Sequence, residues 1–345
     1  MKFTQIMTCS IENCYAVSSL LIDNQLYAIF ASSNENGHCY AFSGKEFEKK
    51  EIIWDTVGGT MSFVQIPGTN GEFVAVQHFF PNFNSIGAKL VTGKRNKDGK
   101  WIVNDLSALP YVHRFDLFNI EGEVFILAAT LCGSKKYKDD WSDPGKVYVG
   151  KLLLEQEKEV QFVPILENLT KNHGYSRGKW KNSDAAFISS DEGVFAITIP
   201  EKKEDIWKHE QIIKRPVSDV AVCDLNNDGK DEIITIEPFH GDSIVVNELH
   251  DGQYRIEYKY PYETEFAHAV VACVLRGKKS IIGGIRSKNG ELFIMQYDKK
   301  NGYESFIIDK GKGPSNVIVI NQPERDLIIC ANNTINQGVI FSVTD

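Results

Sequence analysis

Several oxygen-bearing residues within one short stretch could hold a hard metal ion. The stretch from Val217 to Pro238 reads VSDVAVCDLNNDGKDEIITIEP, with oxygen donors at alternating positions of its central loop. These donors are the side chains of Asp224, Asn226, Asp228 and Glu232 and the backbone carbonyl of Lys230. Donors at this spacing can converge on one cation, and Gly229 lets the backbone wrap around it. We therefore predict a structural Ca²⁺ site, the alternative being a polar hairpin turn without metal.

Two short apolar runs position this loop. Val220–Cys223 and Ile233–Ile236 are rich in β-branched residues and bounded by turn residues, which favours two strands of a hairpin over a helix. The loop resembles the calcium loop of the FG-GAP or VCBS repeat, which lies between two strands of a β-propeller blade. The resemblance covers one blade only and implies a propeller with structural calcium.

The same strand–turn–strand unit recurs along the chain. Seven such units start near residues 12, 59, 111, 182, 217, 265 and 313. Most are followed by two further strand-like runs, and their spacing of roughly 50 residues is typical of four-stranded propeller blades. We therefore predict an all-β fold, a seven-bladed β-propeller forming a single domain over residues 1–345, without a helix of any length.

The last blade would lack one strand. Only the run GVIFSVTD follows its first two strands, whereas the N-terminal run KFTQIM has no partner of its own. An N-terminal strand added to the last blade would leave no open edge between the first and last blades. We predict that residues Phe3–Met7 pair beside Gly338–Val343.

Long connections cluster on one predicted face, which usually marks a binding or catalytic site on a rigid scaffold. Polar residues recur at equivalent positions on this face, where the first strand of each blade starts and the second ends. Those at the starts are Asn13 or Cys14, Ser62, His113, Asp184, Asp219, His268 and Asn316, and those at the ends are Gln77, His78, Glu237, His240, Arg286 and Asn332. We predict that they converge at the mouth of a central channel. The alternative is that they cap strand ends and bind channel water.

Histidine among carboxylates and amides suits a divalent metal such as manganese or zinc, or a general acid–base pair. The sequence has no HExxH, CxxC or GxSxG motif and no phosphate-binding Gly loop. Aromatic and basic residues of the long connections, among them Phe80, Lys136, Tyr175, Arg177 and Lys179, suit a sugar ligand. The alternative is that these aromatic residues pack the loops onto the scaffold.

The layout is similar to that of propeller sugar lyases and of the propeller part of aldos-2-ulose dehydratase. This resemblance covers architecture and no catalytic motif, and it implies β-elimination on a keto- or uronic-type sugar. His113 or His268 would be the base, Arg286 or a bound metal the enolate stabiliser, and Tyr175 the acid, with Asp184 and Asp219 beside them. The predicted substrate-binding residues are His78, Arg177, Lys179, Glu237, His240 and Asn316. The competing interpretation is a non-catalytic propeller scaffold that binds a glycan or a protein.

The composition of the chain indicates which kinds of partner and which cellular compartment to expect. The 345 residues carry 38 Lys and Arg against 46 Asp and Glu, a formal net charge of −8, which argues against nucleic acid as the main partner. No apolar stretch reaches the length of a membrane span, and the N-terminal residues show no signal peptide. Seven scattered cysteines fit buried free thiols. We expect a cytoplasmic protein with a small-molecule or oligosaccharide ligand.

Overall fold

The computed structural model describes residues 1–80, 85–153 and 159–345, which contain 29 strands and one single-turn 3₁₀ helix, η1 (Asn333–Ile335). The expectation of an all-β chain is confirmed. The chain forms two compact units. Unit 1 comprises Met1–Cys9, His173–Ile199 and Lys208–Asp345, and unit 2 comprises Ser10–Asn172 and Pro200–Trp207. No helix among the described residues is long and apolar enough to cross a membrane.

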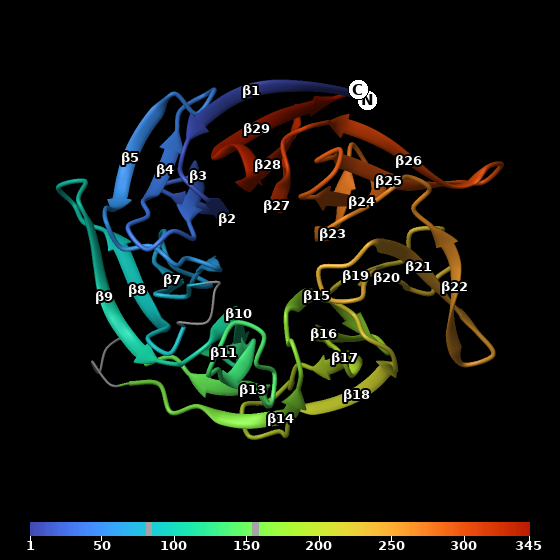
Figure 1. Cartoon of the computed structure of the whole chain (residues 1–345). Coiled ribbons are helices and arrows are strands. Elements are labelled where there is room, and N and C mark those ends of the chain that lie inside the picture. Colours follow the sequence, from blue (N-terminus) through green and yellow to red (C-terminus); the bar gives the residue numbers. More distant parts are fainter. Residues whose placement is uncertain (81–84, 154–158) are drawn as a thin grey trace. The chain divides into compact units, whose positions relative to one another are not determined.

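Unit 2 holds three antiparallel sheets (Figure 1). The first is β2 (Cys14–Ile22), β3 (Gln25–Ser32), β4 (Cys39–Ser43) and β5 (Lys49–Trp54). The second is β6 (Phe63–Gln65), β7 (Phe73–Gln77), β8 (Lys89–Arg95) and β9 (Trp101–Ala108). The third is β10 (Val112–Ile120), β11 (Glu123–Thr130), β13 (Asp143–Lys151) and β14 (Val163–Leu169), with the short β12 (Cys132–Ser134) also paired to β13.

Unit 1 holds four sheets of four strands each. In chain order they begin with β15 (Gly174–Trp180), β16 (Ser183–Ser190), β17 (Gly193–Thr198) and β18 (Lys208–Ile213). The next two are β19 (Asp219–Cys223), β20 (Glu232–Glu237), β21 (Ser243–His250) and β22 (Gln253–Lys259), then β23 (Ala267–Leu275), β24 (Lys278–Ile285), β25 (Leu292–Asp298) and β26 (Gly302–Asp309). The last contains β27 (Pro314–Asn321), β28 (Asp326–Asn332), β29 (Gln337–Thr344) and β1 (Lys2–Ser10).

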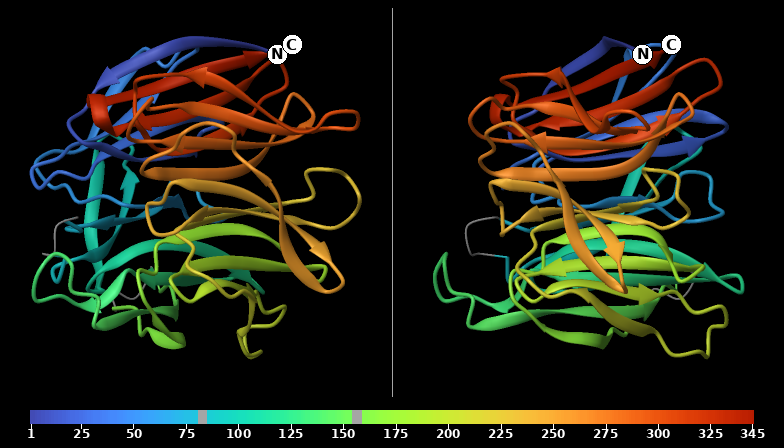
Figure 2. Two further views of the ribbon diagram at one scale, coloured as in Figure 1. Left: turned by 45° about the vertical axis from the view of Figure 1, so that its right-hand side comes forward. Right: turned by 90° about the vertical axis from the view of Figure 1, so that its right-hand side faces the viewer.

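The last sheet of unit 1 is built from both ends of the chain. Its order is β1–β29–β28–β27, so the N-terminal strand forms the outer edge, as predicted. Figure 2 shows the two chain ends close together at that edge. Phe3 packs against a buried cluster that includes Ile328, Val339 and Phe341, so β1 also covers part of the core.

Tight turns join many of these strands, and their residues explain the register. Asp23 and Asn24 connect β2 to β3 with φ of 50° and 61°, and Asp251 and Gly252 connect β21 to β22 with φ of 50° and 79°. Two consecutive positive φ angles match the right-handed twist of a hairpin, and Asp, Asn and Gly tolerate them best.

The predicted start of the fourth sheet is wrong. The segment from Asn182 forms its second and third strands, β16 and β17, whereas the first strand is β15, which begins at Gly174. The run GYSRGKW in β15 has no continuous apolar stretch, and Arg177 and Lys179 are exposed. Apolar periodicity identifies strands, so a strand as polar as β15 gives the same pattern as a loop.

Candidate functional site

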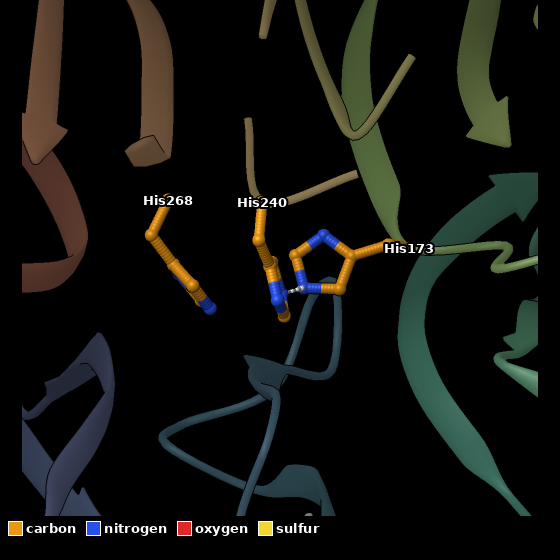
Figure 3. A group of neighbouring side chains, drawn as sticks. All are labelled: His173, His240 and His268. Carbon is orange, nitrogen blue, oxygen red and sulfur yellow. Dashed lines mark hydrogen bonds between the residues drawn. The ribbon is translucent and has the colours of Figure 1, made fainter. Parts of the chain in front are cut away.

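Three histidines converge within unit 1 (Figure 3). His173, His240 and His268 each offer a ring nitrogen, and these nitrogens lie within 4.8 Å of one another. The Nε2 atoms of His240 and His173 are 3.3 Å apart. His173 and His268 are each only 2% exposed, and His240 is partly buried. We call these three residues the histidine cluster.

Three separate elements place these side chains. His173 directly precedes β15, and His240 lies in the loop between β20 and β21, where its backbone is left-handed with a φ of 49°. His268 is the second residue of β23 and is skipped in the pairing with β24, between Ala267 and Ala269. A β-bulge at this point re-aims the bulged side chain, which explains why His268 faces its partners rather than a strand face.

The same bulge recurs in other sheets of both units. The skipped residues are Tyr15 in β2, His113 in β10 and Ser315 in β27. Tyr15, His113, His268 and Ser315 therefore occupy equivalent, bulged positions in their sheets. The expected equivalents Asn13, Cys14 and Asn316 are therefore offset by one or two residues. A bulge adds a residue to one strand only, so alignment of apolar runs does not detect it.

Hydrogen bonds on the far side of the rings orient two of the histidines. The Nδ1 of His173 is 2.9 Å from Oδ2 of Asp219, and the Nδ1 of His268 is 2.7 Å from the carbonyl oxygen of Ser315. A carbonyl or carboxylate oxygen only accepts, so each Nδ1 donates this hydrogen bond, and in a neutral ring Nε2 then carries the lone pair that a metal can bind. Carboxylates and backbone carbonyls hold metal-binding histidines in this way.

This arrangement fits a divalent ion of the zinc class. Tetrahedral zinc with Zn–N bonds of about 2.0–2.1 Å requires ligand nitrogens about 3.3–3.4 Å apart. The Nε2 atoms of His240 and His173 form a hydrogen bond of 3.3 Å, which is also the separation that two tetrahedral ligands require, so a bound ion would replace that hydrogen bond. A site of three neutral imidazoles also leaves a fourth coordination position for a small ligand.

Aromatic rings and a guanidinium surround the histidine cluster. The ring of Phe239 stacks on His240 with centroids 3.9 Å apart, and the ring of Phe266 lies 4.5 Å from His240 and 5.7 Å from His268. The guanidinium of Arg286 is 4.6 Å from the centre of the Phe266 ring, and its Nη2 donates to Oδ1 of Asn333. The cluster is thus polar at its centre and apolar at its rim, with one cation close by.

The structure brings together four of the residues predicted from the sequence: Asp219, His240, His268 and Arg286. The predicted place of Asp184 at the start of a first strand is wrong. Asp184 lies on the second strand of its sheet, β16, is exposed, and pairs through its backbone with Lys179. His173 takes the place expected for Asp184. The one-strand error in the fourth sheet hid it, although a histidine directly before Gly174 and the alternating run GYSRGKW was the available signal.

Other predicted substrate-binding residues have different surroundings. Tyr175, Arg177 and Lys179 alternate along β15, so they share one face of a strand and are not in a loop. Glu237 is engaged by Arg215 through two hydrogen bonds of 2.8 and 2.9 Å and by the hydroxyl of Thr235. Asn316 is half-buried in β27 next to the bulge.

Two predicted histidines belong to unit 2. His113 is 3% exposed, with its Nε2 3.4 Å from the hydroxyl of Tyr15, and its backbone carbonyl accepts a hydrogen bond from Ser62. His78 follows β7 with a φ of 60°, and burial together with the charge of Lys89 lowers its pKa. Phe80 and Lys136 lie in connections of the same unit, and residues 81–84 of the first connection lie outside the described residues.

The loop between β19 and β20 brings three of the five predicted donors together. Carboxylate oxygens of Asp224, Asp228 and Glu232 lie within 4.8 Å of one another. Glu232 is 2% exposed, and burial raises its pKa to about 7 although the backbone N–H groups of Leu225 and Asn226 donate to it. The ammonium of Lys279 lies 2.8 Å from Oδ2 of Asp224. This set of hard oxygens around a concentrated negative charge fits Ca²⁺.

Comparisons with known proteins bear on the fold. No family model matches the chain, and no curated protein matches it. In structure the chain is similar to Sqt1 from Saccharomyces cerevisiae, with a TM-score of 0.56 and 10% sequence identity, over 92% of this chain and 81% of that one. At this identity the likeness shows the fold alone. With the seven sheets, it confirms the predicted seven-bladed β-propeller whose last blade contains the N-terminal strand. The resemblance to FG-GAP or VCBS repeats and to sugar lyases stays a prediction.

Proposed function

We propose that this propeller is a carbohydrate lyase or dehydratase that uses a divalent metal ion held by His173, His240 and His268. The observation that carries the proposal is the convergence of three imidazole nitrogens, two of them 3.3 Å apart, with Nδ1 of two rings bonded to Asp219 and to the Ser315 carbonyl. When bound there, a divalent ion supplies a Lewis acid for a carbonyl or enolate oxygen.

The proposed reaction is a β-elimination on a keto- or uronic-type sugar. A base removes the proton next to the carbonyl or carboxylate, and the C–H electron pair becomes the new C=C bond. The C–O bond at the β-carbon breaks, its electrons stay on the leaving oxygen, and that oxygen takes up a proton. Arg286, beside Phe266, is a second group for the enolate oxygen.

The other roles stay with the residues named from the sequence. His268 is assigned to the metal because its Nδ1 is bonded to Ser315, so it is withdrawn as the base. Tyr175 remains the proposed acid, and Arg177, Lys179 and Asn316 remain proposed ligand contacts. The roles of His113 as base and of His78 as a ligand contact stay predictions from the sequence, because both residues belong to unit 2. Glu237 is withdrawn from this role because Arg215 and Thr235 occupy its oxygens.

Two further parts of the proposal concern stability and compartment. Calcium in the loop of Asp224, Asn226, Asp228, Lys230 and Glu232 would serve structure only, supported by the gathered oxygens described above. A cytoplasmic location is supported by the seven cysteines, all of which are free thiols.

Metal analysis combined with a turnover assay tests the main proposal. The purified protein should contain about one zinc-class ion, and His173→Ala, His240→Ala and His268→Ala should each remove it. His209→Ala, an exposed histidine of β18, is the matched control and should retain it. Keto and uronic sugars should give new absorbance near the enone band with the wild-type protein and not with the cluster variants. Full metal content in all three variants would overturn the site.

A non-catalytic scaffold is the second candidate, and the deep burial of the cluster favours it. Two of the three histidines are 2% exposed, as expected for a structural metal site that only stabilises the fold. In that case, the three histidine variants would contain no metal and would melt at a lower temperature, and the wild-type protein would turn over no sugar. Turnover that disappears with the metal would exclude this second function.

A further inference from the structure

An open hollow of about 690 Å³ lies in unit 1 outside the histidine cluster. It is formed by the loop that joins β22 to β23 and by two flanking residues: Asp242, Lys259–Glu265 and Lys288. Its volume falls within the range of about 300–1,000 Å³ that is usual for small-molecule sites. We call it the β22–β23 hollow.

Two chain segments run directly from the hollow to the histidine cluster, and a third runs to Arg286 beside it. Asp242 is two residues after His240, Glu265 is three residues before His268, and Lys288 is two residues after Arg286. Hydrogen bonds tie these segments together: Ala267 N–H donates to the Gly241 carbonyl, and Arg286 N–H donates to the Phe266 carbonyl, at 3.0 Å each. Because a chain advances at most about 3.6 Å per residue, the rim of the hollow lies within about 11 Å of the backbone that carries the cluster.

The hollow offers one exposed aromatic ring that is held in place. Tyr262 is 46% exposed, and its ring meets the buried Tyr260 ring edge-on with centroids 5.3 Å apart. Tyr260 is itself fixed by its hydroxyl, which donates to Glu291 over 3.0 Å. A flat ring anchored on one side presents a rigid apolar platform at little entropic cost.

The rest of the lining suits a ligand rich in hydroxyl groups. Carboxylates of Asp242, Glu263 and Glu265 accept hydrogen bonds, and the ammoniums of Lys259 and Lys288 donate them. A hydroxyl does both, so a sugar can satisfy this mixed lining, and the two ammoniums can also bind the carboxylate of a uronic sugar. Lys288 contacts Glu263 at 2.6 Å and Glu265 at 3.6 Å, and such exposed ion pairs stabilise little, so hydroxyls can replace them.

We infer that the β22–β23 hollow is a second sugar subsite, which binds the residues of an oligosaccharide adjoining the one held at the histidine cluster. This inference rests on the proposed function of the cluster. Tyr262 stacks on a sugar ring, and the flanking carboxylates and ammoniums bind its hydroxyls. The protein therefore prefers chains of two or three sugars over a single sugar.

Calorimetric titration of the zinc-loaded full-length protein with galacturonic acid and with its linear trimer tests the inference. We expect the trimer to bind about tenfold tighter than the monomer, the contribution of one stacked ring. Tyr262→Ala should lower the affinity for the trimer to that for the monomer, and it should leave the affinity for the monomer unchanged. Tyr262→Phe keeps the platform and should retain most of the difference, and Tyr297→Ala, which replaces a partly exposed tyrosine of β25, should change neither affinity.

The outcomes separate this inference from the proposal on which it rests. A trimer that binds no tighter than the monomer, or whose affinity survives Tyr262→Ala, overturns the subsite and leaves the cluster function standing. Trimer binding that depends on Tyr262 but persists in His268→Ala supports the subsite and overturns the role of the cluster. Absence of binding by both sugars overturns both.

Discussion

At the scale of single residues, the pair of Asp219 and His173 carries the most chemical information. The carboxylate and the imidazole are buried together at 2.9 Å, and Ser218 also donates its hydroxyl to Asp219. Burying a carboxylate is costly unless its oxygens are satisfied. Here the cost is offset by a contact that orients one ring of the cluster, so Asp219 would position His173 for the proposed metal ion.

Asp219→Asn should therefore weaken metal binding without emptying the site. An amide can donate to Nδ1 of His173 and stabilise the wrong tautomer, and loss of such an outer contact costs about 10- to 100-fold in metal affinity. Competition with a chromophoric chelator measures the affinity. Asp184→Asn, an exposed aspartate of the neighbouring strand β16, is the matched control and should bind metal as the wild type does. Equal affinities in the two variants would contradict the positioning role.

His78 gives a pH dependence with a definite sign. Burial and the nearby Lys89 lower its pKa, so the folded state favours the neutral ring. A lowered pKa contributes stability that is present above the unfolded value of about 6.5 and is lost as the pH falls through the folded value.

The free energy of unfolding should thus decrease between pH 7 and pH 5, and His78→Asn should remove part of that decrease. Asparagine is the conservative replacement because it tolerates the left-handed φ of 60° at this position. Urea unfolding at several pH values measures the effect, and an NMR titration of the ring checks its cause. A His78 midpoint at or above 6.5 would contradict the prediction.

Sequence patterns located some of these residues and missed others for a physical reason. Asp219, His240 and His268 were found because they flank apolar strands whose β-branched runs are easily recognised. His173 was missed because the strand that follows it is polar, and Ser315 because a bulge shifts the register by one. Periodicity detects which face a strand buries, but the direction of a side chain at a bulge depends on pairing with another strand.

At the scale of elements, the loop between β19 and β20 joins two sheets of unit 1. Its Asp224 forms an ion pair with Lys279 of β24, so the loop is tied to the next sheet as well as to its own hairpin. This hairpin could be predicted well, because its two β-branched runs flank a loop with oxygen donors at alternating positions and a glycine. The ion pair could not, because the two partners are 55 residues apart in the sequence.

Asp228→Ala should lower the melting temperature in the presence of calcium and have little effect in a chelator. The proposed site loses one of its charged donors, so the stabilisation by bound calcium should fall, whereas the exposed side chain contributes little by itself. Differential scanning calorimetry with calcium and with EDTA measures the difference. Asp205→Ala, an exposed aspartate elsewhere, serves as the control. A wild-type melting temperature that ignores calcium would show that the loop is an ordinary turn.

At the scale of the whole molecule, the fold class followed from the repeat. Seven strand–turn–strand segments and an N-terminal run without a partner were enough to predict seven sheets and the composition of the last one. The division into two compact units could not be predicted from the repeat. It depends on how side chains pack between sheets, which a repeat pattern does not encode.

The sequence predicts a single domain, which implies a single cooperative unfolding transition. Calorimetry should give equal calorimetric and van 't Hoff enthalpies, and fluorescence and circular dichroism should report one midpoint in urea. Trp54, Trp101, Trp141 and Trp207 report on unit 2, and Trp180 reports on unit 1. A variant with Trp180→Phe therefore reports on unit 2 alone, and a variant with the other four tryptophans replaced by Phe reports on unit 1 alone. Separate midpoints for these two variants would show that the two units unfold independently.

The pairing of β1 with β29 determines when the last sheet can form during synthesis of the chain. β1 is made before every other strand of the seven sheets, yet its partner β29 is the last of these strands to be made. At about 5–20 residues per second, β1 waits for tens of seconds with its hydrogen-bonding groups unpaired. During that time it is exposed to other nascent chains and to proteases. We therefore expect the yield of native protein to depend on translation speed and on chaperones at the step in which the last blade is completed.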